Sequence, residues 1–442
     1  MTLEDFLKRH AALSADKPAV VCAEGVFTYS QLYSLAEGYA EAMRSDGVKP
    51  HSAVVVRATP SAHFLARYFA VHMLDAVCVP MPADAVDADI DAMNARLADI
   101  RFPADAADLL FTSGTTGNAK GVVVSKRAIT ANAENLIGSQ GFSAQTQFII
   151  NGPLNHIGSL SKVYPVISLG ATLRIIDGMK DINAFFCAVD DAGCHVATFL
   201  VPAAIHMLLT LAHSRLVACD GKIDFIETGS APISRPDMLA LCQALPSACL
   251  FNTYASTETG IITTYNFNDG HTVAGCLGKT MLNAKLRINA DGCVECGGGS
   301  LLLGYVDGSQ LITDVLTRDG WFTTRDRGSV DSEQRLMLAG RADDIINVGG
   351  FNVDPLEVES VAMSFPDISE CICVPFSHPV VGNALKLIVV MRQGASLDQR
   401  ALARFIASKI ERHKVPMRYE LASQLLRTFN GKLNRKAYLQ TV

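Results

Sequence analysis

The sequence predicts an α/β protein with a large N-terminal domain and a small, mobile α+β C-terminal domain. Apolar strand-like runs alternate with amphipathic helical segments up to Asn268, a pattern typical of mostly parallel sheets with flanking helices. At 442 residues, of which 49% are hydrophobic, the chain can form more than one core. A change of pattern at Gly340 places the domain boundary between residues 1–339 and 340–442.

The N-terminal elements follow from apolar spacing and turn residues. Residues 1–10 have the spacing of a short amphipathic helix, and residues 27–30 lead into a helix whose N-cap we expect to be Ser30. Strands are expected at 53–57 and 77–80, on either side of a helix at 64–73. Further strands, separated by helical segments, are expected at 148–151, 172–176, 195–201 and 222–228.

The character of the sequence changes after Asn268. Glycine-rich, β-prone runs predict a small β-barrel or a curled sheet, with strands at 273–278, 285–296 and 300–305. The C-terminal domain has a pattern of its own. Its helices are expected at 355–363 and 398–410, and its strands at 370–374 and 385–391.

Charge and composition exclude several classes of protein. The net charge of −6 leaves no general basic surface for nucleic acid. Pro202 and His206 interrupt the longest apolar stretch, so we expect no membrane span, and residues 1–10 lack the apolar core of a signal peptide. The twelve cysteines are scattered, which is typical of the reducing cytoplasm. We interpret the Cys293–Cys296 spacing as core filling, with zinc or redox chemistry a remote alternative.

Residues 109–124 contain the strongest functional signal. A strand-like run is followed by hydroxyl side chains and glycines, then by a lysine and a β-branched run. Glycines let backbone N–H groups approach an anion, while short hydroxyls and a lysine add donors and charge. The spacing differs from the common P-loop, and the alternative is a plain turn between two strands. We expect a polyphosphate site formed by Thr112, Ser113, Gly114, Thr115, Thr116, Gly117 and Lys120.

This segment resembles the signature loop of the AMP-forming adenylating enzymes, which include acyl-CoA synthetases, the adenylation modules of peptide synthetases and firefly luciferase. It matches their Thr-Ser-Gly-Thr-Thr-Gly-x-Pro-Lys-Gly pattern except at Ala119, which replaces proline. Further stretches resemble the family in its own order, up to residue 436. The short segment between Met81 and Asp108 is similar to that of compact acyl-CoA ligases such as o-succinylbenzoate–CoA ligase. This shortening would bear on the acyl entrance or on an oligomer contact, such as that of a homodimer.

The resemblance implies an acyl pocket in the large domain. The segment around His156 would border this pocket, and the Gly229-Ser230-Ala231 turn would lie against the adenine and the acyl group. The wall expected near His156 and residues 200–204, 229–231 and 254–256 is apolar, and we find no fixed cation in it for a second substrate carboxylate. This favours a small or medium monocarboxylic acid, aromatic or aliphatic.

The resemblance also implies a nucleotide site on the segment from Asn252 to Glu258. Tyr254 would stack on adenine, Asn252 would meet its amino group, and Thr257 would reach the α-phosphate. Glu258 would help to hold Mg²⁺. A ring face, an amide and a carboxylate are chemically suited to these tasks. Ala255 replaces the family's usual glycine and should narrow the pocket slightly.

The remaining motifs lie near and beyond the domain boundary. Asp326 and Arg341 would contact the ribose, and Asp343 would be the hinge about which the small domain rotates. The Gly349-Gly350 turn would line a thiol tunnel, and Lys432 would reach the carboxylate and α-phosphate during adenylation. Two departures from the family pattern are Arg325 in place of glycine and Asn347 in place of lysine.

Together these roles imply ATP-dependent and Mg²⁺-dependent activation of a carboxylic acid through an acyl-adenylate, followed by thioester formation with CoA. Such a reaction needs charge compensation between two anions and no side-chain nucleophile. An alternative acceptor is the phosphopantetheine thiol of an acyl carrier protein. A further alternative is a non-catalytic nucleotide-binding relative, which Ala119, Arg325 and the short N-terminal part motivate, whereas the retained Lys432 and Glu258 argue against it.

Overall fold

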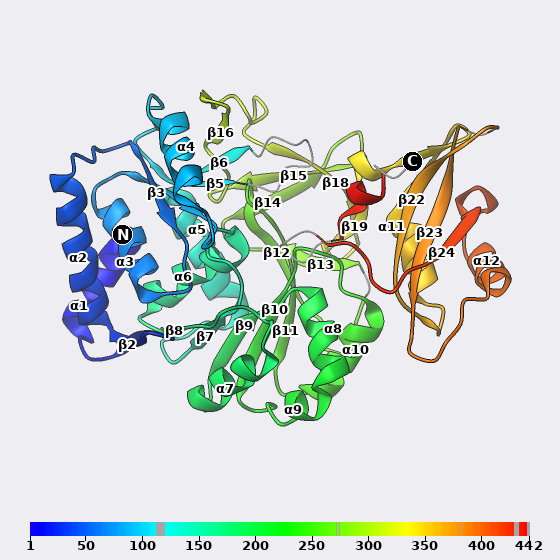
Figure 1. The fold of residues 1–442 in the computed structure, drawn as a ribbon, viewed down its shortest axis with the longest axis horizontal. Coiled ribbons are helices and arrows are strands. Elements are labelled where there is room, and N and C mark those ends of the chain that lie inside the picture. The colour runs from blue at the N-terminus through cyan, green and yellow to red at the C-terminus, as the bar shows by residue number, and fades with distance from the viewer. Residues whose placement is uncertain (112–119, 271, 274, 381, 428–432, 440–442) are drawn as a thin grey trace. The chain divides into compact units, whose positions relative to one another are not determined.

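A computed structural model describes residues 1–111, 120–270, 272–273, 275–380, 382–427 and 433–439. The chain forms two compact units (Figure 1). The larger contains residues 1–273, 277–286 and 295–323, and the smaller contains 274–276, 287–294 and 324–442. The predicted α/β class, with a large N-terminal part and a small C-terminal part, is confirmed. The boundary at 339/340 and the hinge at Asp343 stay predictions.

One sheet of the larger unit leads into the polyphosphate motif. Its order is β17-β16-β6-β5-β4-β3. The strands are β3 (Ala53–Arg57), β4 (Val77–Met81), β5 (Ala106–Phe111), β6 (Gly121–Ser125), β16 (Gly304–Asp307) and β17 (Gln310–Ile312). The helices α3 (Ala62–Met73) and α4 (Asp87–Leu97) follow β3 and β4. β5 and β6 pair antiparallel, with Phe111 opposite Gly121, so the motif leaves and re-enters the same sheet.

The second sheet has, from β13 to its end, the order β13-β12-β11-β10-β9-β7-β8-β1-β2, and four further strands extend it beyond β13. Its strands are β1 (Pro18–Cys22), β2 (Gly25–Thr28), β7 (Gln147–Ile150), β8 (Thr172–Ile175), β9 (Val196–Phe199), β10 (Ile223–Thr228), β11 (Cys249–Ser256), β12 (Gly260–Asn266) and β13 (Cys276–Thr280). The strands from β7 to β11 are parallel. The carboxyl ends of β9, β10 and β11 therefore meet at one edge, where ligands bind in open α/β sheets.

Helices cover these sheets (Figure 1), and most follow the strand after which we expected them. They are α1 (Leu3–Leu13), α2 (Tyr29–Ser45), α5 (Lys126–Gln140), α6 (Ile157–Leu169), α7 (Ile182–Ala192), α8 (Pro202–Leu211), α9 (His213–Val217) and α10 (Arg235–Ala244). Among the described residues, no helix is both long and apolar enough to cross a membrane.

The expected N-cap at Ser30 is wrong. The helix α2 starts at Tyr29, and Thr28 is its N-cap. The Thr28 hydroxyl accepts a hydrogen bond from the Gln31 N–H, and the Gln31 side chain accepts one from the Thr28 N–H. This reciprocal capping box satisfies two backbone donors. Tyr29 is also fully buried and donates to the Ala171 carbonyl, which holds it inside the helix.

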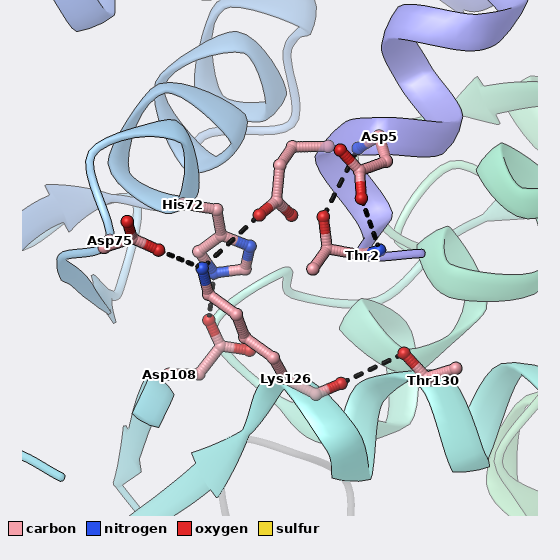
Figure 2. A network of polar contacts seen from close by, with 8 residues as sticks. Thr2, Asp5, His72, Asp75, Asp108, Lys126 and Thr130 are labelled. Atoms are coloured by element: carbon pink, nitrogen blue, oxygen red, sulfur yellow. Dashed lines mark hydrogen bonds and ion pairs between the residues drawn. The ribbon is translucent and has the colours of Figure 1, made fainter. Parts of the chain in front are cut away.

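A buried carboxylate, Asp108, lies on β5 just before the polyphosphate motif (Figure 2). His72 Nε2 lies 2.9 Å from its Oδ1, and the hydroxyls of Tyr68 and Tyr164 donate to Oδ2 over 2.9 and 3.3 Å. Burial raises the pKa of both tyrosines well above its usual value, which keeps them protonated donors. Asp108 therefore ties β5 to α3 and α6.

A half-buried lysine links two helices and a turn of the same unit. Lys126, the first residue of α5, pairs with Asp75 at 2.5 Å and with Glu4 of α1 at 3.4 Å (Figure 2). The Thr2–Asp5 capping box lies at the start of the same helix α1. These contacts fix the N-terminal helix to the start of the helix that follows β6.

The β-rich region after Asn268 contains β14 (Ala284–Ile288), β15 (Cys293–Gly298), β18 (Phe322–Val330) and β19 (Leu336–Arg341). The chain passes between the two units within these strands. Cys293 and Cys296 are three positions apart on β15, so their side chains leave opposite faces of the strand. That geometry agrees with core filling at Cys296, which is fully buried.

The smaller unit is an α+β domain with its own core. Its sheet has the order β21-β20-β23-β22, with β24 parallel to β23. Its elements are β20 (Ile346–Val348), β21 (Phe351–Val353), α11 (Pro355–Met363), β22 (Ile368–His378), β23 (Gly382–Met391), α12 (Gln399–Ala407) and β24 (Arg418–Leu421). Buried residues of α11 and α12 pack on this sheet, and both predicted helices and both predicted strands are confirmed.

Candidate functional site

Strand pairing brings Lys120 and Glu258 to the same tyrosine in the larger unit. β16 pairs with β6 so that Tyr305 lies opposite Val122, close to Lys120. The Lys120 Nζ lies 5.8 Å from the centre of the Tyr305 ring and 3.4 Å from Asp307 Oδ2. The Tyr305 hydroxyl donates a 3.2 Å hydrogen bond to Glu258 Oε1. The predicted phosphate-binding lysine and the predicted metal-binding carboxylate are thus neighbours of one aromatic side chain.

The turn Gly229–Ala231 follows β10 and lies against β11. Thr228 is opposite Asn252 in the parallel pairing of these strands. A Cβ atom at Gly229 would lie 2.9 Å from the Thr253 Oγ1 and 3.0 Å from its carbonyl oxygen, so only glycine fits there. Ser230 has a left-handed φ of 71°, which marks a tight turn held by its surroundings. Within the described chain, the buried Thr228 hydroxyl has no hydrogen-bond partner, so it suits a polar ligand.

The predicted nucleotide residues lie at the end of β11 and in the turn after it. Asn252 and Tyr254 are buried on β11 beside the Gly229 turn, while Thr257 and Glu258 are half-buried in the turn to β12. The turn is braced by the hydroxyls of Ser256 and Thr259, which lie 3.1 Å apart and accept each other's backbone N–H.

The predicted acyl wall is assembled around Phe199 at the end of β9. His156 is the N-cap residue of α6, and Gly158 lies in the first turn of that helix. Cβ atoms built at Gly158 and Gly229 would lie 3.7 and 3.8 Å from the Phe199 ring. The ring therefore separates the α6 segment from the Gly229 turn, and the two parts that the resemblance places on the acyl pocket are close in space.

The smaller unit brings its own predicted residues together. Asp326 and Arg341 are opposite each other on β18 and β19, with an ion-pair distance of 3.7 Å. Arg325, which replaces a glycine of the family pattern, lies on extended β18 and pairs with Asp343 at 2.7 Å. The strand has no left-handed residue at this position, so arginine is accommodated without strain.

Gly349 and Gly350 form the turn between β20 and β21. Both have positive φ angles, 57° and 94°, as the two central residues of the favoured two-residue hairpin turn require. The Asn347 side chain accepts a hydrogen bond from the Gly350 N–H. The asparagine that replaces the family's lysine thus stabilises the turn.

Two predicted groups lie outside the described residues, namely Thr112–Gly117 and Lys432. The residues on either side of each are well anchored. Phe111 pairs with Gly121, and Arg427 pairs with Leu433. Beyond Lys432, the mostly buried Arg435 pairs with Glu359 of α11 at 2.6 Å.

The sequence analysis missed Tyr305 and the ion pair between Lys162 and Glu227. Tyr305 lies in a run that we interpreted only as a strand, and Lys162 lies on a helix with no motif around it. The pair adds a feature that we did not expect: a cation lies near the acyl wall, since the Lys162 Nζ is 5.3 Å from the Phe199 ring centre, but Glu227 neutralises it. No spacing within the sequence signals either contact.

Family models match both units. The AMP-binding enzyme family matches residues 7–101 and 95–304, and the AMP-binding enzyme C-terminal domain matches residues 357–432. The chain belongs to the AMP-binding enzyme family. Among its relatives, an indoleacetate–CoA ligase of Aromatoleum aromaticum is 29% identical over 100% of this chain and 98% of its own. A 2-succinylbenzoate–CoA ligase of Staphylococcus epidermidis is 25% identical over 98% of this chain and 96% of its own.

Solved structures agree on the fold. ATP-bound MatB of Rhodopseudomonas palustris superposes with a TM-score of 0.87 at 22% sequence identity, covering 99% of this chain and 98% of MatB. Family membership implies a nucleotide, and the observed site fits one because it combines a glycine cradle, an unpartnered buried hydroxyl and a lysine. Glu258 offers hard oxygen ligands for Mg²⁺, which commonly binds one carboxylate together with substrate phosphates.

Proposed function

We propose that this AMP-binding enzyme is an acid–CoA ligase that activates a small carboxylic acid with ATP and releases AMP and pyrophosphate. The observation that carries the proposal is the convergence of Lys120 and Glu258 on Tyr305. Glu258 follows β11, the strand that carries Tyr254 and packs against the Gly229 turn. Its full-length CoA ligase relatives support the same reaction.

In the first step, a carboxylate oxygen of the acid attacks the α-phosphorus of ATP, and the bond to pyrophosphate breaks. Both reactants are anions, so positive charge and hydrogen-bond donors have to compensate them. Lys120 would bind the phosphates, and Lys432 would contact the carboxylate and the α-phosphate. Mg²⁺ held through Glu258 would supply further charge compensation. Tyr305 would orient Glu258 through its hydroxyl.

In the second step, the CoA thiol attacks the acyl carbon, a C–S bond forms, and AMP leaves. We propose that the Gly349-Gly350 hairpin turn lines the tunnel through which the thiol arrives. Rotation of the small domain about Asp343 would withdraw Lys432 from the active site and bring this turn to it. A carrier-protein thiol remains the alternative acceptor. A homodimer and a cytoplasmic location stay predictions.

The test is acid-dependent pyrophosphate release with ATP and Mg²⁺, measured over a panel of monocarboxylic acids with and without CoA. We expect release with one structural class of acid and a rise on adding CoA. Pyrophosphate release that does not change when CoA is added would favour a carrier protein as acceptor. No release with any acid, while ATP still raises the melting temperature, would favour the non-catalytic alternative.

A further inference from the structure

A fully buried ion pair lies next to the acyl wall, and the proposed reaction does not use it. Lys162 of α6 and Glu227 of β10 each have 1% of their side-chain surface exposed. The Lys162 Nζ lies 2.7 and 2.6 Å from the two carboxylate oxygens of Glu227. The Thr253 hydroxyl lies 3.0 Å from Glu227 Oε1 and also 3.1 Å from the Thr228 carbonyl oxygen.

Two contacts connect this pair to the predicted pocket. The Thr253 hydroxyl, which contacts Glu227, would lie 2.9 Å from a Cβ atom built at Gly229. Phe199 is opposite Glu227 in the parallel β9–β10 pairing, so both side chains leave the same face of the sheet. The Lys162 Nζ lies 5.3 Å from the centre of the Phe199 ring. Cβ atoms built at Gly158 and Gly229 would lie 3.7 and 3.8 Å from the same ring. The Phe199 side chain therefore lies between the ion pair and the two parts of the acyl wall, the α6 segment at Gly158 and the Gly229 turn.

Stability does not account for the pair. Removing two charges from water is costly, and well-packed hydrophobic replacements of a buried ion pair are often neutral or stabilising. An ammonium group has three hydrogens, and in the part of the chain that the structure describes Glu227 is its only hydrogen-bond acceptor. A hydrogen-bond donor of Lys162 is thus available beside the Phe199 ring.

We propose that Lys162 and Glu227 form a polar end of the acid pocket and select an acid that carries a neutral hydrogen-bond acceptor, a keto or hydroxyl group, remote from its reacting carboxylate. The pair has no net charge, so a neutral acceptor can bind the remaining Lys162 hydrogen without adding a buried charge. A second carboxylate would leave one unpaired buried negative charge, which is strongly unfavourable. The inference rests on the proposed function for the identity of the pocket.

The test compares acids that share a skeleton and differ in one group. Suitable probes are phenylacetate against 4-hydroxyphenylacetate, and hexanoate against 5-oxohexanoate, with hexanedioate as the dicarboxylic acid. Binding is measured by calorimetry in the presence of a non-hydrolysable ATP analogue, and turnover by pyrophosphate release. In at least one pair, we expect the acid with the acceptor to bind about 10- to 100-fold more tightly, as for a hydrogen bond to a charged group. Hexanedioate should bind more weakly than the keto acid.

The decisive variant is the double substitution Lys162→Met/Glu227→Leu, which removes both charges and leaves the Thr253 hydroxyl its Thr228 acceptor. We expect this variant to lose the preference, with matched acids binding within about threefold of each other. The control is Lys222→Met/Asp190→Asn, which removes an exposed pair of the same unit and should leave the preference unchanged.

The outcomes separate the two proposals. A binding preference that disappears in the double variant supports the selective role of the pair, whether or not pyrophosphate is released. Equal binding of the matched acids by the native protein, tighter binding of hexanedioate, or a preference that survives in the double variant would overturn it. Absence of release from acids that bind would instead contradict the proposed ligase activity.

Discussion

At the scale of single residues, Tyr305 is the side chain that joins the predicted functional groups. Its ring contacts the Lys120 ammonium, and its hydroxyl donates to Glu258. A half-buried carboxylate in a turn can adopt several rotamers, and a hydrogen bond from a strand residue restricts them. Tyr305 therefore acts through Glu258, as a positioning residue.

Tyr305→Phe keeps the ring and removes the hydrogen bond to Glu258. We expect kcat/KM for ATP in the adenylation step to fall about tenfold, and the Mg²⁺ concentration needed for activity to rise. The reason is that the Glu258 carboxylate loses its hydrogen bond from Tyr305. The measurement is pyrophosphate release at varied ATP and Mg²⁺. The matched control is Tyr419→Phe, since the buried Tyr419 hydroxyl has no partner among the described residues. An unchanged Mg²⁺ requirement would contradict the positioning role.

At the scale of elements, Asp108 connects the strand before the polyphosphate motif to two helices. It is fully buried and has Tyr68 and His72 of α3 and Tyr164 of α6 around its two oxygens. Buried polar groups without partners are costly, and this carboxylate satisfies such groups on two helices at once.

Asp108→Ala would leave these buried donors without an acceptor. We expect the unfolding free energy of the larger unit to fall by about 2–4 kcal/mol, measured as a lower melting temperature and faster hydrogen exchange in β5. Asp99→Ala, which removes an exposed carboxylate between α4 and β5, should change neither quantity. Equal melting temperatures for the two variants would show that the hydrogen bonds around Asp108 do not stabilise the larger unit.

At the scale of the whole molecule, the proposed reaction assigns different steps to different parts of the small unit. Lys432 is assigned to adenylation, and the Gly349-Gly350 turn to thioester formation. The two assignments require the small unit to change its position between the steps.

Lys432→Ala tests this assignment. We expect adenylation to become undetectable, because the charge between carboxylate and α-phosphate is lost, while thioester formation from a supplied acyl-adenylate is largely retained. The two half-reactions are measured separately, as pyrophosphate release and as acyl-CoA formation. A similar loss in both would contradict the domain rotation about Asp343.

The elements were the part of the fold most accessible from the sequence. The strand β3 and the helix α11 have the expected bounds, and the Gly349-Gly350 turn has the positive φ angles that glycine pairs suggest. Such features depend on residues close in sequence. The N-cap of α2 was misplaced because burial of Tyr29, a tertiary effect, starts the helix at that residue and makes Thr28 its N-cap.

The sequence by itself determined the α/β class, the family resemblance, and the residues that offer a phosphate site, an adenine platform and a carboxylate. These signals are local runs of chemically apt side chains. Only the tertiary structure decided that Tyr305 joins Lys120 to Glu258, and that Lys162 and Glu227 form a buried pair behind Phe199. The physical reason is that these contacts are made by strand pairing and helix packing between distant segments, which leave no periodicity in the chain.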